Sequence, residues 1–296
     1  MLTEFTFITL TFNHSKYIIE HLESIKSLIE KYGKNISIDM LVADDCSSDT
    51  TILLAEKWLN DNRYMFRNIN ILSSFENKGT IQNLINALEK CQTRFFKFLS
   101  GDDAYYDNNI FTIVENTTNI LVTPIIPIVE NGSSAYIFKS IMNNFYILDY
   151  ACRKGMTDFI MKYDNFLPAP GVFVPCDSLK NEEYYSFISK YKFIEDIPTW
   201  HYLYFIKKIG MDIMYEPFVR YRIGCGISTD KQSKNRNYFN EEKNTIVKDF
   251  KLKKYIFPKS VNIYRYLFYF LKKKALKRHN QVYDKYHDIS KKSHNY

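Results

Sequence analysis

The sequence predicts an α/β fold in which a parallel sheet carries helices on both of its faces. Two observations support this prediction. Segments with strand character and segments with helical character alternate through residues 1–105, and each of the strongest strand-like segments ends in polar residues. Alternation at this period implies right-handed crossovers between parallel strands, and ligands of such sheets bind beyond the carboxyl ends of the strands.

Four strands are expected in this first part of the chain, at residues 5–12, 36–43, 70–74 and 95–99. The first strand, FTFITLTF, is rich in β-branched and aromatic residues, which favours a buried strand. Three helices are expected between the strands, at residues 16–32, 50–62 and 80–91. Apolar residues recur three and four positions apart in the first helix, and Gly33 is a stop signal after it.

The pattern of residues 106–247 is less regular. Strand-like segments are expected at 120–129, 136–139 and 172–175, and helical segments at 140–150, 177–190 and 197–209. The sequence shows no linker, internal repeat or low-complexity stretch before residue 247. We therefore expect the second half to pack directly on the first sheet.

Composition limits the class of protein. The chain has 296 residues, of which 46% are hydrophobic and 17% aromatic, enough for a large core. Its five cysteines are scattered without C-x-x-C spacing, which argues against a disulfide framework or a zinc site and favours a reducing cytosol. The first residues lack a basic n-region and no apolar run approaches the ~20 residues of a membrane span. We expect a cytoplasmic protein, either soluble or peripheral on the inner face of the cell membrane.

The positive charge is concentrated at the carboxyl terminus. Residues 248–296 contain 14 Lys and Arg against 3 Asp and Glu, a net charge of +11, whereas the whole chain carries +7, so residues 1–247 carry −4. This basic tail includes an aromatic and aliphatic run at residues 263–271, followed by lysines, which predicts a helix. The helix can lie on an anionic membrane surface or pack its aromatic face on the rest of the protein. Nucleic-acid binding is not expected, because no recognisable module accompanies the basic residues.

Pairs of adjacent acidic residues follow two of the predicted strands. Asp44 and Asp45 end the second strand, and Asp102 and Asp103 follow the fourth. A single aspartate after a strand often serves a turn or a helix cap. Adjacent carboxylates repel each other, however, and a divalent cation such as Mg²⁺ or Mn²⁺ relieves this repulsion, usually with phosphate oxygens completing its shell. No glycine-rich phosphate-binding motif is present.

Six segments together resemble a known enzyme family. TFNHSKYIIEHLESI, VADDCSSDTT, ENKGTIQNLINAL and FFKFLSGDDAYY, followed by FIEDIPTW and YRIGCGIS, resemble the motifs of family-2 glycosyltransferases of the GT-A fold, in the same order and at similar spacing. The resemblance covers roughly residues 4–230. It implies a metal-dependent, inverting transfer of a hexose or N-acetylhexosamine from a nucleotide sugar, expected to be a UDP-sugar, to a hydroxyl of a glycan or lipid-linked acceptor. The implied pathway is surface polysaccharide or lipooligosaccharide synthesis.

The resemblance also implies an organisation of the chain. Residues 1–247 would form the glycosyltransferase domain, with a nucleotide-binding half at 1–105 and an acceptor half at 106–247, and residues 248–296 would form the basic helical tail. On the donor side, Thr11 and Asn13 would lie along the base and ribose, Asp45 would accept a hydrogen bond from the uracil imide, and Asp44 would support the turn. The nucleotide would also be bordered by Asn77, Lys78 and Gly79, with Asn83 holding that loop.

The remaining implied roles concern metal and catalysis. The metal ligand would be Asp102, alone or with Asp103; Ser100 stands where the family often has a further aspartate. Asp196 would be the general base, with Glu195 orienting the acceptor, although this acidic pair also suits the first turn of a helix. Arg222 would reach the phosphates, within a segment made mobile by Gly224 and Gly226; many relatives have a histidine in this segment, and this sequence has none.

Other classes of protein remain as alternatives. A non-catalytic glycan-binding protein could retain the same fold, because a fold does not determine activity. A magnesium-dependent phosphatase of the haloacid-dehalogenase type would need a nucleophilic aspartate after the first strand, where this chain has Asn13. A nucleotidyltransferase would need a glycine-rich, arginine-bearing loop at the same place, and NHSKY does not provide it.

Overall fold

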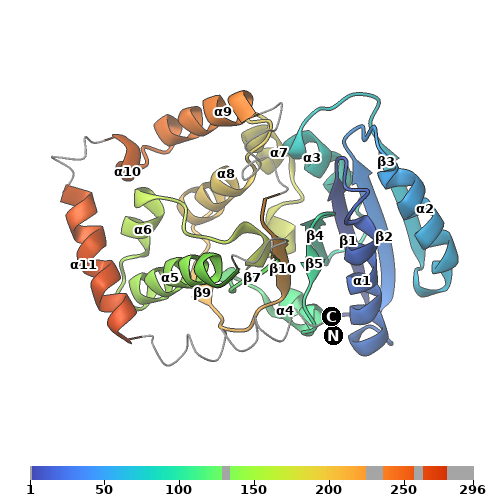
Figure 1. Cartoon of the computed structure of the whole chain (residues 1–296), viewed down its shortest axis with the longest axis horizontal. Helices are drawn as coiled ribbons and strands as arrows, with labels where there is room; N and C mark the ends of the chain where they lie inside the picture. Colours follow the sequence, from blue (N-terminus) through green and yellow to red (C-terminus); the bar gives the residue numbers. More distant parts are fainter. Residues whose placement is uncertain (1, 129–133, 225–235, 257–262, 279–296) are drawn as a thin grey trace.

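The structure is a computed structural model and describes residues 2–128, 134–224, 236–256 and 263–278 (Figure 1). Within these residues the free cysteines are Cys46, Cys91, Cys152 and Cys176. Cys225 and Gly226 lie outside the described residues.

The central sheet has four parallel strands in the order β3-β2-β1-β4. The strands are β1 (Glu4–Thr11), β2 (Ser37–Asp44), β3 (Asn68–Ser73) and β4 (Phe96–Ser100). They confirm the four predicted strands, with bounds that differ by one or two residues. Their register aligns the carboxyl ends, since Thr11 pairs with Asp44 and Leu10 pairs with Ser100.

Helices cover both faces of this sheet, as predicted. The three crossover helices are α1 (Ile18–Tyr32), α2 (Thr51–Asp61) and α3 (Thr80–Lys90). The chain moves from β1 through β2 to β3 in one direction, so right-handed crossovers place α1 and α2 on the same face, where they contact each other. The direction reverses between β3 and β4, and α3 therefore lies on the other side of the sheet from α2 (Figure 1).

A buried histidine connects α1 to the end of β4. The ring of His21 contacts Thr9 Oγ1 through Nε2 at 2.7 Å and the carbonyl oxygen of Asp103 through Nδ1 at 2.8 Å. Burial lowers its pKa to about 4, so the ring is neutral near pH 7. Because both ring nitrogens are engaged, His21 fixes the position of the turn that carries Asp102 and Asp103.

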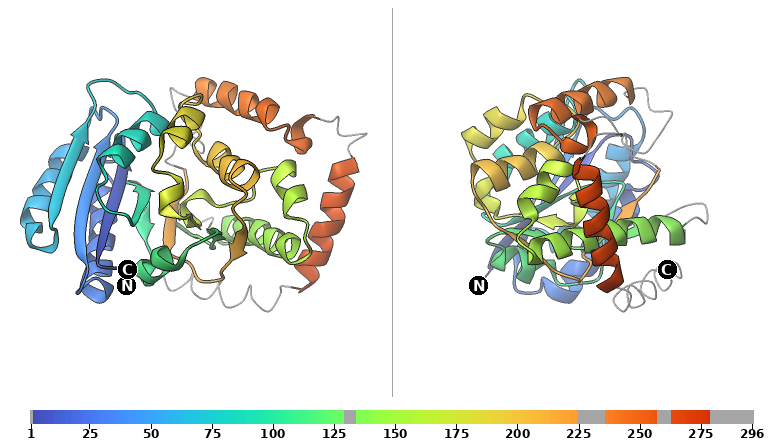
Figure 2. Two further views of the ribbon diagram at one scale, coloured as in Figure 1. Left: turned by 180° about the vertical axis from the view of Figure 1, so that it is seen from behind. Right: turned by 90° about the vertical axis from the view of Figure 1, so that its left-hand side faces the viewer.

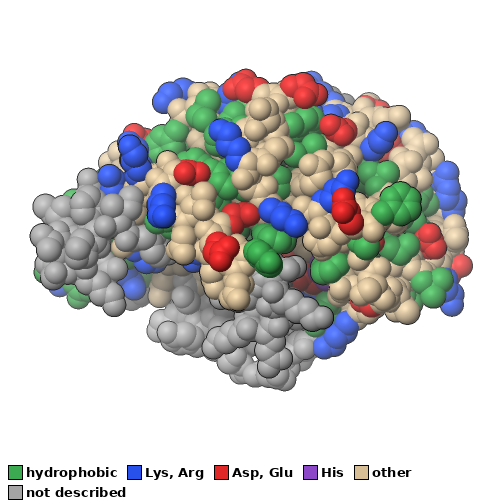
Figure 3. Space-filling model, turned by 90° about the horizontal axis from the view of Figure 1, so that it is seen from above, with side chains coloured by type: hydrophobic (Ala, Val, Ile, Leu, Met, Phe, Trp, Pro, Cys, Tyr) green, Lys and Arg blue, Asp and Glu red, His purple; other side chains and the backbone are tan. Residues whose placement is uncertain are grey.

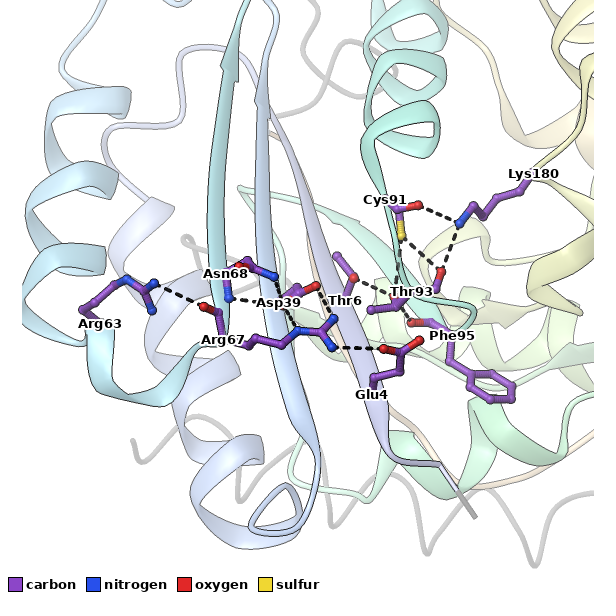
Figure 4. Close-up of polar contacts among 10 residues, drawn as sticks. All are labelled: Glu4, Thr6, Asp39, Arg63, Arg67, Asn68, Cys91, Thr93, Phe95 and Lys180. Atoms are coloured by element: carbon purple, nitrogen blue, oxygen red, sulfur yellow. Dashed lines mark hydrogen bonds and ion pairs between the residues drawn. The ribbon is translucent and has the colours of Figure 1, made fainter.

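A polar cluster closes the amino-terminal edge of the sheet (Figure 4). Asp39 accepts hydrogen bonds from Nε and Nη2 of Arg67 at 2.8 and 2.6 Å, and Arg67 Nη1 also contacts Glu4 at 3.0 Å. Nearby, Lys180 donates to the carbonyl oxygens of Cys91 and Thr93 at 2.6 and 3.0 Å. These contacts join neighbouring strands and fasten the second half of the chain to the turn between α3 and β4.

The second half contains two small three-stranded sheets with the orders β5-β10-β7 and β8-β6-β9. Their strands are β5 (Ala104–Tyr105), β6 (Ile120–Val122), β7 (Ile126–Ile128), β8 (Val172–Phe173), β9 (Met211–Ile213) and β10 (Val219–Arg222). The helices around them are α4 (Ile110–Asn116), α5 (Ser134–Arg153), α6 (Thr157–Tyr163), α7 (Glu182–Ile188) and α8 (Asp196–His201), which continues as a π-helix at Tyr202–Ile206.

Three predictions for this half were wrong in type or extent. Residues 136–139, predicted as a strand, belong to α5, whose later residues Met142, Phe145 and Tyr146 are buried at helical spacing. The single strand predicted at 120–129 is divided into β6 and β7, with Pro124, which lacks an N–H, between them. The helix predicted from residue 177 begins only at Glu182, where the side chain of Asn181 caps it.

The carboxyl-terminal part is helical, with α9 (Arg236–Asp249), α10 (Lys253–Ile256) and α11 (Ile263–Arg278). The predicted boundary between residues 247 and 248 falls within α9 and remains a prediction. Figure 1 shows α11 at the end of the molecule opposite the central sheet. Among the described helices, none combines the length and the apolar character needed to cross a membrane.

Candidate active site

Polar residues gather at the carboxyl edge of the central sheet, the edge seen from above in Figure 3. The backbone N–H of Asp45 donates to the carbonyl oxygen of Thr11 at 3.0 Å, and the N–H of Gly101 donates to that of Leu10 at 2.9 Å. These bonds continue the strand pairing by one residue. They hold the beginnings of the three loops after β1, β2 and β4 next to one another.

Asn13 joins the loops after β1 and β2. Its side-chain oxygen accepts hydrogen bonds from the backbone N–H groups of Ser48 and Asp49 at 2.8 and 3.3 Å, and its own N–H donates to Ser47 Oγ at 2.8 Å. Asn13 has a φ of 57°, a conformation that asparagine tolerates better than most residues. Asp44 accepts from the N–H and Oγ of Ser47 at 2.9 and 2.5 Å, so it supports this turn, as predicted from the sequence.

Asp45 is buried and holds the loop after β3. Its two carboxylate oxygens accept the backbone N–H groups of Lys78 and Gly79 at 2.7 and 2.8 Å. Asn77 Nδ2 donates to the carbonyl oxygen of Asp45 at 3.3 Å, and Asn83 Nδ2 donates to that of Ala43 at 2.7 Å. Burial raises the pKa of Asp45 despite these hydrogen bonds. The residues predicted to border a nucleotide therefore form one connected loop around this carboxylate.

This loop lies directly against the second half of the chain. Gly79 has a φ of 92°, and a Cβ atom there would lie 2.5 Å from the carbonyl oxygen of Lys192. The same carbonyl oxygen accepts the N–H of Ile81, the second residue of α3, at 3.1 Å. Only glycine fits at this position. The contact brings the donor-side loop to within three residues of Glu195 along the chain.

The two aspartates after β4 have different environments. Asp102 Oδ1 accepts a hydrogen bond from Ser100 Oγ at 2.5 Å and lies 3.8 Å from His14 Nε2. Asp103 Oδ1 instead accepts the backbone N–H of Arg222 at 2.8 Å, and burial together with the charge of Asp102 raises its pKa well above the ordinary value. Asp102, whose carboxylate accepts a serine hydroxyl, therefore fits the chemistry of a metal ligand better than Asp103, whose carboxyl is engaged by the N–H of Arg222.

Arg222 lies beside these aspartates but is engaged by other groups. Its Nε donates to the carbonyl oxygen of Asp102 at 2.9 Å, and its Nη2 pairs with Glu20 of α1. The guanidinium carbon lies 4.3 Å from the centre of the Tyr17 ring, a cation–π contact. These contacts fix the end of β10 next to Asp102. The predicted role of Arg222 toward phosphates remains a prediction, and so does the mobility predicted for Gly224.

Glu195 and Asp196 stand at the beginning of α8. Asp196 accepts hydrogen bonds from Asn165 Nδ2 at 2.8 Å and from the N–H of Ile197 at 2.7 Å. Burial raises the pKa of both carboxyls, and the charge of Asp196 raises that of Glu195 further. A small cavity adjoins Asn165 and is lined by Met161, Asp164, Asn165, Ile197, Trp200 and His201.

A glutamate from α9 holds the turn before this acidic pair. Glu242 accepts the backbone N–H groups of Lys192, Phe193 and Ile194, with shortest distances of 2.7, 2.9 and 2.7 Å. Neither Glu242 nor Asn165 was identified from the sequence, because neither belongs to a local motif. The partners of Glu242 lie 48 to 50 positions away in the chain, and Asp196, the partner of Asn165, lies 31 positions away.

A divalent cation at this edge would have few protein ligands. No group of three or more His, Cys, Asp and Glu side chains is arranged to hold a metal ion within the described residues. Asp102 can still hold a cation whose other ligands come from diphosphate oxygens and water, the usual arrangement for Mg²⁺. The residues present are compatible with such a metal.

The parallel sheet, the acidic residues at its carboxyl edge and the loop around Asp45 define an α/β protein of the nucleotide-binding class. The sequence model of Glycosyl transferase family 2 matches residues 6–162, more than half of the chain. The chain therefore belongs to glycosyl transferase family 2, which confirms the resemblance found in the sequence. No curated protein sequence matches the chain.

Solved structures of S. aureus TarS resemble most of the chain. TarS 1–349 in complex with UDP-GlcNAc has a TM-score of 0.53 and 19% sequence identity, and the match covers 83% of this chain and 66% of that one. The complex of TarS 1–349 with UDP has a TM-score of 0.51 and 18% identity, and the match covers 88% of this chain and 74% of that one. This chain spans 44% of the longer TarS structure. At these identities the similarity shows the fold, which is the predicted GT-A fold.

Proposed function

We propose that the protein is an inverting glycosyltransferase that moves a sugar from a UDP-sugar to a hydroxyl of a glycan or lipid-linked acceptor. The observation that carries the proposal is the contact between Gly79 and Lys192. It joins the loop held by Asp45 to the turn that leads to Glu195 and Asp196. The proposed donor loop is thereby in contact with the turn that precedes the candidate bases, and a direct displacement requires such proximity of donor and base.

Donor binding is assigned to the loops after β1, β2 and β3. The residues proposed to line the nucleotide are those predicted from the sequence: Thr11, Asn13, Asp44, Asp45, Asn77, Lys78 and Gly79. Support comes from family membership and from the shared fold with TarS, which has been crystallised with UDP and UDP-GlcNAc. Each oxygen of Asp45 accepts one loop N–H and retains a second lone pair for a donor such as the uracil imide.

A divalent cation is part of the proposal, and Asp102 would hold it. When bound, such a cation neutralises charge on the departing diphosphate. Ser100 Oγ orients the Asp102 carboxylate, and Arg222 supports its backbone through the hydrogen bond to the carbonyl oxygen. Asp103 stabilises the turn through the N–H of Arg222, so we assign it a structural part beside the metal ligand.

Asp196 is the proposed general base. The acceptor hydroxyl would attack the anomeric carbon on the face opposite the diphosphate, and its proton would pass to Asp196 as the new C–O bond forms and the bond to diphosphate breaks. Asn165 and the N–H of Ile197 hold the carboxylate in one orientation. Burial raises its pKa toward neutrality, which makes it a stronger base than an exposed aspartate.

The acceptor is proposed to belong to surface polysaccharide or lipooligosaccharide synthesis, as the sequence resemblance implies. The second half of the chain would bind it, next to the acidic pair at the beginning of α8. Glu195 would orient the acceptor hydroxyl toward Asp196.

The test combines a donor screen with one variant. UDP-sugars are screened with Mn²⁺ for thermal stabilisation and for transfer or slow hydrolysis, and D196N is compared with the wild type. We expect D196N to lose turnover on the order of 10³-fold while binding UDP with unchanged affinity. D158N, at an exposed aspartate paired with Lys162, is the control and should retain full activity.

Each possible failure of this test points to a different part of the proposal. Full turnover in D196N would contradict its role as the base. A protein that binds none of the UDP-sugars in the presence of metal would contradict the proposed donor class.

A further inference from the structure

Helix α11 has two chemically different faces. On the inner face Phe268 stacks on Tyr163, with ring centres 4.6 Å apart, and contacts the tilted ring of Phe166 at 5.3 Å; Leu271 and Ala275 are buried. This face packs on the body of the protein through α5 and α6. The packing predicted as one of two alternatives for the tail therefore accounts for the inner face of the helix and leaves the outer face unexplained.

The outer face begins with exposed apolar side chains. Tyr266, Tyr269 and Phe270 are 72%, 69% and 57% exposed, and Leu267 is exposed beside them. Four large apolar side chains thus face solvent within five consecutive residues. The other exposed large apolar side chains of the described residues are scattered singly: Phe12, Ile19, Leu53, Tyr64, Phe75, Ile206 and Tyr238. A contiguous exposed apolar group of this kind indicates an interaction surface.

Lysines follow the apolar residues along the same face. The exposed residues Tyr266, Phe270, Lys273 and Lys277 are spaced by four, three and four positions, which places them in one line along the helix. The exposed side chains of Lys272 and Lys274 flank this line, and the ammonium of Lys274 lies 4.3 Å from the centre of the Phe270 ring. The sequence of α11, IYRYLFYFLKKKALKR, contains no acidic residue.

We propose that this outer face of α11 binds the surface of an anionic lipid membrane. Tyrosine and phenylalanine side chains partition into the boundary between headgroups and acyl chains, and adjacent lysines are attracted to anionic headgroups. The charge distribution agrees with this partner, because residues 1–247 carry −4 and the remainder of the chain +11. The face combines apolar and cationic groups, whereas a nucleic acid would be held mainly by the cations.

The position of α11 allows this contact without covering the candidate active site. The helix lies at the end of the molecule farthest from the central sheet, and it faces the viewer in the right-hand view of Figure 2. A membrane in contact with its outer face would leave the carboxyl edge of the sheet accessible. The inference stands independently of the proposed reaction, because it concerns binding alone.

The experiment measures cosedimentation of the full chain with phosphatidylcholine vesicles that contain either no anionic lipid or about a third of phosphatidylglycerol. We expect binding to the anionic vesicles, weaker binding to neutral ones, and release at high salt. K273Q/K277Q should bind roughly 30-fold more weakly, since each lysine contributes about a fivefold effect near an anionic surface. Y266S/F270S should reduce binding to both kinds of vesicle.

Matched controls change the same residue types elsewhere on the surface. K57Q/K90Q removes two exposed lysines from α2 and α3, and L53S/Y64S removes two exposed apolar side chains near α2. Both controls should bind like the wild type, and thermal melting should show that all variants are folded. Equal binding of the two α11 variants and the wild type would overturn the proposal. A second result would also overturn it: a short RNA competes with the anionic vesicles for the protein, and Y266S/F270S binds these vesicles like the wild type. That combination would indicate a general site for polyanions.

Discussion

The two edges of the central sheet both carry buried aspartates, and they use them differently. At the amino-terminal edge Asp39 is held by the guanidinium of Arg67 through two hydrogen bonds (Figure 4). At the carboxyl edge Asp45 accepts only backbone N–H groups, and Asp102 accepts one serine hydroxyl. The first arrangement compensates a carboxylate charge with a side-chain cation, whereas the second leaves much of that charge for another partner.

This difference separates Asp39 from the aspartates proposed to bind ligands better than burial does. Asp39, Asp45 and Asp102 are all almost fully buried. A carboxylate paired with a fixed cation contributes to stability, because loss of either partner leaves the other unpaired. A carboxylate held by neutral donors keeps its charge available for a ligand. Substitution of Asp39 should therefore lower stability, whereas substitution of Asp102 should lower turnover and metal-dependent binding.

Among variants at the two edges of the sheet, the largest effect is expected at Asp102. D102N should lower turnover on the order of 100-fold, because the neutral amide is a poor ligand for the cation proposed at the diphosphate. Calorimetry should show that Mn²⁺ no longer strengthens UDP binding, while the midpoint of thermal unfolding changes little. If Mn²⁺ strengthened UDP binding by D102N as much as by the wild type, a residue other than Asp102 would be the metal ligand.

At Asp39 we expect the opposite result, a loss of stability without a loss of donor binding. D39N should lower the free energy of unfolding by about 2 kcal/mol, since hydrogen bonds to a charged partner are lost and Arg67 remains. Urea denaturation measures this change, and the KM for the donor should stay at the wild-type value. If D39N instead weakened donor binding without loss of stability, the distinction between the two edges would not hold.

Glu242 provides an intermediate case, because its carboxylate acts on the acidic pair through the turn at Lys192–Ile194. E242Q should lower kcat roughly tenfold by loosening this turn, with little change in UDP affinity. The negative charge of Glu242 also raises the pKa of Glu195, so E242Q should lower the pKa of this carboxyl. The neighbouring exposed variant E241Q is the control and should show neither effect.

A further effect concerns the pH dependence of stability. The folded protein retains a proton on Glu195 to higher pH than the unfolded chain does, because burial raises the pKa of this carboxyl. The unfolded chain ionises first, so the free energy of unfolding falls as pH rises from the ordinary carboxyl pKa toward the raised one. E195Q should reduce this fall between pH 5 and 8 in chemical denaturation. An unchanged slope would show that Glu195 does not titrate in this range.

The sequence predicted the first half of the fold well, since its strands and helices have strong local patterns. FTFITLTF and the spacing of Ile18, Leu22 and Ile25 are sufficient to identify β1 and α1. The short strands of the second half have two to four residues, too few for a period to be recognised. The segment at 136–139, Tyr-Ile-Phe-Lys, was mistaken for a strand for the same reason, because so short a segment fits either structure.

The candidate site was predicted in outline but not in its supporting contacts. The acidic pairs at the strand ends and before α8 were visible because they are adjacent in sequence. The environments that distinguish Asp102 from Asp103 depend on Ser100 and on Arg222, which is 119 positions from Asp103. The carboxylate of Glu242 reaches its turn from α9 in a similar way. Such contacts are set by tertiary packing and have no local sequence signal.

The close approach at Gly79 has a consequence for how the specificity of this enzyme class can diverge. The gap between the nucleotide loop and the turn before Glu195 is defined by main-chain atoms, with no room even for a methyl group. Substitutions among acceptor-contacting side chains would leave that spacing intact. Under the proposed function, new acceptor specificities can therefore arise by mutation while the contact between Gly79 and Lys192 is unchanged.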